Sequence, residues 1–139
     1  MRRFAVLGAA VVLLAGGCGA GDTSADKTPG QTTPGLVTKT IESGEVTVTV
    51  DPVRIDETGA EFEITLDTHS VELDMDLAEE ATLEVDGDVW TGASWAGDGA
   101  NGHHREGTLS FDPGGPAQGD AVLTIGGFPA AVRISWRLG

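Results

Sequence analysis

The three histidines of the chain lie in two short segments, and each segment also carries a carboxylate. His69 follows Asp67 where a strand is expected to end, and the adjacent pair His103 and His104 precedes Glu106. Imidazole and carboxylate groups are side chains that bind copper and zinc in proteins. His69, one of the paired histidines, and Asp67 or Glu106 therefore make a candidate copper or zinc site.

The spacing of these residues does not define a metal site. Adjacent side chains in an extended chain point in different directions, so at most one of His103 and His104 is expected to join a given site. The alternative interpretation is structural. One of the two donates a hydrogen bond to loop backbone and packs on Trp95, the other faces solvent, and the protein has no cofactor.

No catalytic constellation is recognisable in the sequence. Ser70 and His69 are neighbours in extended chain, so their side chains project to opposite faces. Tyrosine is absent, and no glycine-rich segment joins a strand to a helix as in phosphate-binding loops. We therefore expect that the protein is not an enzyme.

The N-terminus has the pattern of an export signal. Two arginines, at positions 2 and 3, precede an apolar and glycine run at 4–14, then three small residues and Cys18. This order is typical of a signal peptide, and the run is shorter than the roughly 20 residues of a membrane-spanning helix. It leaves both the Sec and the twin-arginine export routes open.

The residues Leu14-Ala15-Gly16-Gly17-Cys18 resemble the lipobox of bacterial and archaeal lipoproteins, with the leucine one place earlier than usual. The resemblance implies cleavage of a lipoprotein signal peptide at 1–17, acylation of Cys18, and a membrane anchor. An ordinary secreted protein, with Cys18 removed or left as a free thiol, is the alternative.

The remaining chain divides into a tether and one domain. Residues 18–40 are rich in Gly, Thr, Ser and Pro and poor in large apolar side chains, which predicts a flexible tether that carries the lipidated cysteine. Residues 41–139 suit one domain. Since Cys18 is the only cysteine, that domain has no internal disulfide and depends on its apolar core.

Apolar residues alternate with polar ones along most of the domain, which predicts an all-β fold. Seven or eight short strands with hairpin signals indicate a small antiparallel immunoglobulin-like β-sandwich, with a small barrel as the alternative. Pro52 predicts a bulge or the end of an edge strand, and Asp86-Gly87 predicts a hairpin turn. Gly92–Gly107 is expected to be a glycine-rich loop, and the core aromatic residues to be Phe62, Trp90, Trp95, Phe111 and Trp136. The expected strands lie at 45–50, 61–67, 72–77, 83–85, 89–90, 109–111, 121–125 and 132–138.

The charge balance excludes nucleic acid as a partner. The chain has 22 acidic and 8 basic residues, a net charge of −14. A surface this acidic repels phosphate backbones and favours solubility.

Three segments, FEITLDTHSVELDMDL, SW…GHHREGTLSF and GGFPAAVRISW, resemble an uncharacterised family of bacterial and archaeal secreted or lipid-anchored β domains. The resemblance extends from Val46 to Trp136. Members often have a proline-rich loop before the paired histidines, where this chain has residues 97–102. Since the family has no established activity, the resemblance implies the fold and the location and no mechanism.

The sequence thus predicts a lipoprotein anchored to the cell membrane, facing the extracytoplasmic side. Its domain is expected to be a non-catalytic binding or structural module that contacts an envelope protein or a small ligand. The alternative is a copper- or zinc-binding lipoprotein that uses His69 and the His103-His104 loop. The oligomeric state stays open.

Overall fold

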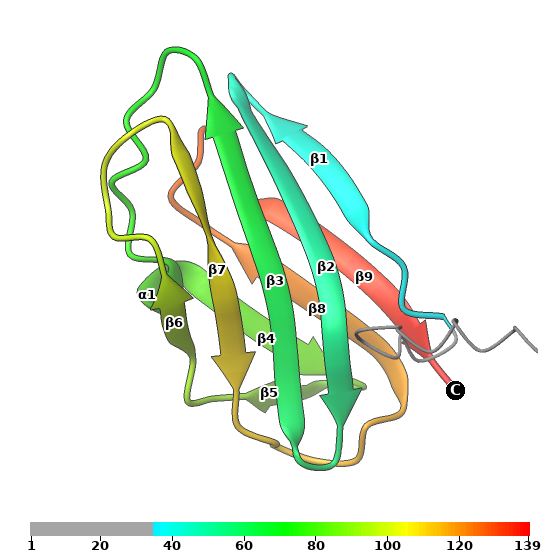
Figure 1. Ribbon diagram of the computed structural model, residues 1–139. Coiled ribbons are helices and arrows are strands. Elements are labelled where there is room, and N and C mark those ends of the chain that lie inside the picture. The colour runs from blue at the N-terminus through cyan, green and yellow to red at the C-terminus, as the bar shows by residue number, and fades with distance from the viewer. Residues whose placement is uncertain (1–34) are drawn as a thin grey trace, which may run out of the picture.

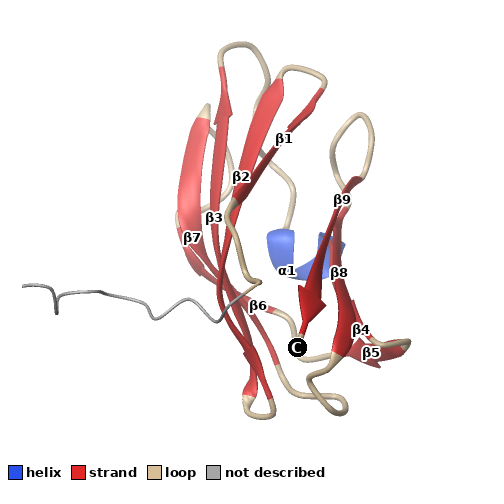
Figure 2. Ribbon diagram, turned by 90° about the vertical axis from the view of Figure 1, so that its right-hand side faces the viewer, coloured by secondary structure: helices blue, strands red, loops and turns tan. Residues whose placement is uncertain are grey.

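The computed structural model describes residues 35–139, which form two antiparallel sheets packed face to face as separate layers (Figures 1 and 2). One sheet has the order β1 (Lys39–Ser43), β2 (Val46–Asp56), β3 (Gly59–Thr68), β7 (His104–Phe111) and β6 (Ser94–Gly97). The other has the order β5 (Asp88–Trp90), β4 (Ala81–Val85), β8 (Gly119–Ile125) and β9 (Val132–Leu138). A single helical turn, α1 (Leu77–Glu80), precedes β4.

The predicted all-β sandwich is confirmed, with nine strands in the described residues instead of seven or eight. Within residues 35–139 no helix has the length and apolar composition that a membrane crossing requires. The predicted signal peptide at 1–17 and the tether residues 18–34, Cys18 included, lie outside the described residues.

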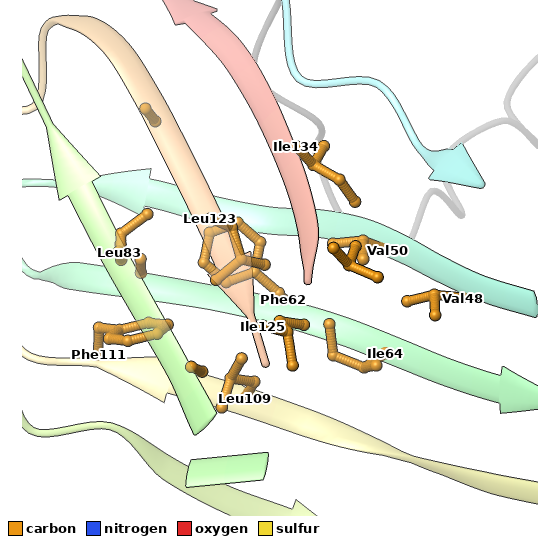
Figure 3. Packing of buried hydrophobic residues seen from close by; sticks show 14 of the residues in the cluster. Val48, Val50, Phe62, Ile64, Leu83, Leu109, Phe111, Leu123, Ile125 and Ile134 are labelled. Carbon is orange, nitrogen blue, oxygen red and sulfur yellow. The ribbon is translucent and has the colours of Figure 1, made fainter. Parts of the chain in front are cut away.

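The core consists of the inward-facing residues of both layers (Figure 3), which alternate with more exposed residues along most strands. The Phe62 ring of β3 lies 5.4 Å from the Trp136 ring of β9, and so joins the two sheets. It also meets Phe111 edge to face at 6.2 Å. Four of the five expected core aromatic residues are buried, and only Trp95 is half-buried.

Two local predictions are confirmed by the backbone. The register of β2 against β3 shifts between Pro52 and Arg54, which is the predicted bulge. β1 pairs with β2 only as far as Val50, so Pro52 lies beyond the end of β1. The N–H that proline lacks is therefore not needed for a hydrogen bond to β1. At the hairpin from β4 to β5, Asp86 and Gly87 both have positive φ, 50° and 89°, as a tight hairpin turn requires.

The predicted strand at 72–77 is wrong, although its inward positions Leu73 and Leu77 are buried. The backbone of Leu73 bonds to a loop: its N–H donates to the Gly102 carbonyl at 3.0 Å, and its carbonyl accepts from the Asn101 N–H at 2.8 Å. Asp76 then caps α1 by accepting from the first free N–H groups of that turn. An extended segment shows the same period of two as a strand, so the pattern alone cannot separate them.

The folded domain begins before the predicted boundary at residue 41. Leu36 is buried, and β1 starts at Lys39, inside the stretch that we assigned to the tether. The Trp136 Nε1–H donates to the Val37 carbonyl at 2.8 Å, and Lys39 Nζ donates to the Ser135 carbonyl at 2.5 Å. These contacts tie the start of the domain to β9. Because β1 is short and largely polar, the sequence pattern did not indicate that the domain begins here.

The cross-layer role of Phe62 gives a stability prediction. We expect Phe62→Ala to lower the free energy of unfolding by about 3–5 kcal/mol, because it removes a buried ring from both sheets. The neighbouring outward position supplies the control, and Glu63→Ala is expected to change the value by no more than about 0.5 kcal/mol. Denaturant unfolding followed by tryptophan fluorescence measures both variants, and equal losses would contradict this account of the core.

Candidate functional site

The structure brings together three of the five predicted metal ligands on the outward face of the five-stranded sheet. Asp67 on β3 stands directly opposite His104 on β7. The carboxylate Oδ1 of Asp67 lies 2.6 Å from His104 Nδ1, and Glu106 Oε2 lies 3.5 Å from His104 Nε2. All three side chains are more than half exposed, so the cluster lies on an open surface.

The Asp67 hydrogen bond is the main cause that raises the pKa of His104 above its ordinary value. The charges of Asp67 and Glu106 add to it, because both favour the imidazolium form. Protonated His104 therefore stabilises the folded domain. That contribution is complete below the ordinary histidine pKa of about 6.5 and is lost as pH rises through the raised value.

The predicted copper or zinc site has no supporting geometry in the part of the chain that the structure describes. Among residues 35–139 no three or more His, Cys, Asp or Glu side chains are grouped so that they could hold a metal ion. His69 lies in the loop after β3, and His103 precedes β7, where its carbonyl accepts from the Thr68 N–H at 2.9 Å. Both are exposed, and neither completes the pair formed by His104 and Asp67.

The prediction that His103 or His104 packs on Trp95 is wrong, because Arg105 occupies that place. The guanidinium carbon of Arg105 lies 5.5 Å from the centre of the Trp95 ring, and the indole N–H donates to the Asp98 carbonyl at 2.8 Å. The predicted loop at 92–107 contains a strand at this point. β6 pairs with β7 so closely that a Cβ at Gly107 would lie 2.6 Å from the Gly97 Cα and 2.8 Å from the indole. Glycine at position 107 therefore makes room for Trp95, and glycine at position 97 makes room for the backbone of β7.

Arg105 is a buried cation that sequence reasoning missed. It is 2% exposed, and no carboxylate within residues 35–139 lies at ion-pair distance from it. Its guanidinium donates to the carbonyls of Leu73 at 3.2 Å, Met75 at 2.8 Å and Asp98 at 3.2 Å, while its Nε has no partner. Arg105 thus joins the loop after β3 to the loop between β6 and β7.

A hollow of about 450 Å³ lies beside this arginine. It is within the size range of small-molecule sites. Its lining combines an aromatic ring, apolar side chains, a cation and two carboxylates. The main members are Asp74, Met75, Asp76, Leu77, Trp95 and Arg105. A sequence signal for it existed, since Arg105 has the same strand parity as buried Leu109 and Phe111.

No protein-family model matches the chain, and no curated protein or solved structure is significantly similar to it. The resemblance of the segments between Val46 and Trp136 to an uncharacterised family therefore stays a prediction. The two candidate sites, the His104 cluster and the hollow beside Arg105, rest on their geometry.

The His104 cluster predicts a titration that can be followed by NMR. We expect the His104 imidazole to titrate above about 6.5. Asp67→Asn should lower its pKa, because the amide cannot stabilise the imidazolium as a carboxylate does. Glu84→Gln, at an exposed position of the other sheet, is the control and should leave the pKa of His104 unchanged. A His104 pKa unchanged by Asp67→Asn would refute the assignment of Asp67 as the main cause.

The role of Arg105 predicts a large loss of stability on truncation. We expect Arg105→Ala to lower the free energy of unfolding by about 2–5 kcal/mol, because three carbonyls lose their donor and Trp95 loses its neighbour. Exposed Arg133→Ala removes the same charge from the surface and should cost less than about 0.5 kcal/mol. Thermal and urea unfolding of the two variants tests the difference, which should survive in 1 M salt.

Proposed function

We propose that the protein is a lipoprotein, anchored to the extracytoplasmic side of the cell membrane by acyl chains on Cys18. The observation that carries the proposal is the position of the chain's single cysteine. Cys18 follows a basic start, an apolar run too short to span a bilayer, and three small residues. A single cysteine at this place has an obvious use as an acylation site and no use in a disulfide within the chain.

The architecture of the domain agrees with a protein that is displayed outside the cytoplasm. Its 24 buried apolar residues supply a continuous core, so the domain requires no disulfide. The first described residues run along β9 and reach the core at Leu36, so the domain begins close behind the tether. An anchor on Cys18 would then hold a folded module by a short connection.

We further propose that the module binds or supports a partner and does not catalyse a reaction. Both ring nitrogens of His104 face carboxylates, Asp67 and Glu106, which leaves neither nitrogen free to accept a proton from a serine or threonine. The hollow beside Trp95 and Arg105 offers a different chemistry. An aromatic ring, apolar side chains and a few polar groups are typical of surfaces that bind small molecules.

Replacing Cys18 tests the anchor directly. The full chain and its Cys18→Ala variant are expressed in a bacterial host fed with labelled fatty acid, and the cells are fractionated. We expect the parent chain to incorporate label and to sediment with membranes, and Cys18→Ala to lose the label and to fall at least about tenfold in the membrane fraction, since acyl chains supply the anchoring energy.

Thr23→Ala, five residues further along the predicted tether, is the matched control and should behave as the parent chain. A free Cys18 thiol on the exported parent protein would refute the proposal and favour an ordinary secreted protein. Retention of Cys18→Ala in membranes without label would also refute the proposal, because it would show an anchor other than acyl chains on Cys18.

A further inference from the structure

The two outward faces of the sandwich differ in charge. The outward positions of the five-stranded sheet, which we call the acidic face, carry seven carboxylates: Glu42, Asp51, Asp56, Glu61, Glu63, Asp67 and Glu106. Arg54 is the only lysine or arginine among the described residues of that face, and it is paired with Asp56 and Glu61. The His104 cluster lies there as well.

The outward positions of the four-stranded sheet, which we call the β9 face, are close to neutral. β9 presents Arg133, Ser135 and Arg137, without a carboxylate. The two carboxylates of this face are Glu84 and Asp120, and Asp120 is bonded to Arg137 at 3.0 Å. Exposed Val89, at 56%, and half-buried Val122 add apolar surface.

The chain enters the domain at the edge of the β9 face. Val37 accepts from Trp136, and Lys39 bonds to the Ser135 carbonyl while its ammonium lies 5.7 Å from the centre of the Trp136 ring. Three of the five basic residues of the described chain therefore lie on β9 or against it: Lys39, Arg133 and Arg137. The other two are the paired Arg54 and the buried Arg105.

The tether alone does not choose which face meets a membrane. The 18 residues from Cys18 to Gly35 span at most about 60 Å when fully extended, enough to present any side of a small domain. The charge of each face decides the orientation instead. Next to an anionic headgroup surface, each charge changes the population of an orientation roughly fivefold. Since the screening length is about 8 Å and the sheets pack about 10 Å apart, the nearer face dominates.

We propose that the anchored domain rests with its β9 face toward anionic lipid headgroups and its acidic face turned to the aqueous side. The inference rests on the proposed acylation of Cys18 and adds the lipid surface as a second, non-covalent contact of the domain. The near-neutral β9 face, where Arg133 and Arg137 offset Glu84 and Asp120, is repelled least by the headgroups. The seven carboxylates of the acidic face supply the repulsion that excludes the reversed orientation.

Two matched cysteine variants of the acylated full chain test the orientation. Ser135→Cys lies in the middle of the β9 face, and Thr65→Cys lies in the middle of the acidic face. Since acylation blocks Cys18, each variant has one reactive thiol for a fluorophore. The proteins are reconstituted in vesicles of phosphatidylglycerol and phosphatidylcholine that carry a lipid-bound quencher. We expect quenching at position 135 to exceed that at position 65 by at least threefold.

Three further measurements identify the cause. The excess at position 135 should disappear in 1 M salt, in vesicles of phosphatidylcholine alone, and when Arg133→Glu and Arg137→Glu are added to Ser135→Cys. Equal quenching at the two positions in anionic vesicles would overturn the orientation, and so would an excess at position 65. An excess that persists in neutral vesicles or in the double glutamate variant would overturn the electrostatic cause.

The parent chain, without an added cysteine, shows separately whether the acyl anchor on Cys18 is present. A parent chain that takes up the fluorophore on Cys18 and does not float with vesicles would contradict acylation itself, before any comparison of the two faces. A parent chain that floats and takes up no fluorophore leaves the comparison of positions 135 and 65 as a test of orientation alone.

Discussion

The whole domain depends on the burial of two apolar sheet faces against each other, with no covalent cross-link to support it. Each strand contributes every second residue, and the contact between Phe62 and Trp136 shows how directly one layer meets the other. This constraint explains why polar residues are confined to the outward faces and the loops. It also explains why the surface can be so acidic, because the core carries the stability that charge repulsion would reduce.

Arg105 is the exception that organises one side of the molecule. A charged group inside a protein is costly unless its donors are satisfied. Here backbone carbonyls of two loops take the place of a carboxylate, and the side chain thereby fixes both loops around Trp95. The hollow beside Arg105 is a consequence of that arrangement, since its walls are the loops that the arginine holds.

Much of the fold could be predicted because a period of two is a local property. It identified β2, β3, β8 and β9, and the Asp86-Gly87 turn located the hairpin between β4 and β5. It failed where extended chain bonds to a loop, as at Leu73, and where a strand has few apolar residues, as in β1.

The candidate sites were harder to predict, because their contacts join residues far apart in the chain. Asp67 meets His104 only because of the register of β3 against β7, which no short stretch of sequence specifies. Grouping the histidines by composition placed His69 and His103 in a site that the fold does not assemble. Arg105 shares the inward parity of its strand, but an arginine is so seldom buried that parity alone does not predict a place in the core.

The way in which the chain enters the domain has a mechanical consequence. Val37 and Lys39 join β9 of one sheet through hydrogen bonds, while β1 itself pairs with β2 of the other. Tension that arrives along the chain from its N-terminal side is therefore divided between the two layers at their common seam. A pull that separated the two sheets here would have to break the hydrogen bond between Trp136 and Val37 together with the β1–β2 ladder. The first strand therefore shields the core behind it from that force.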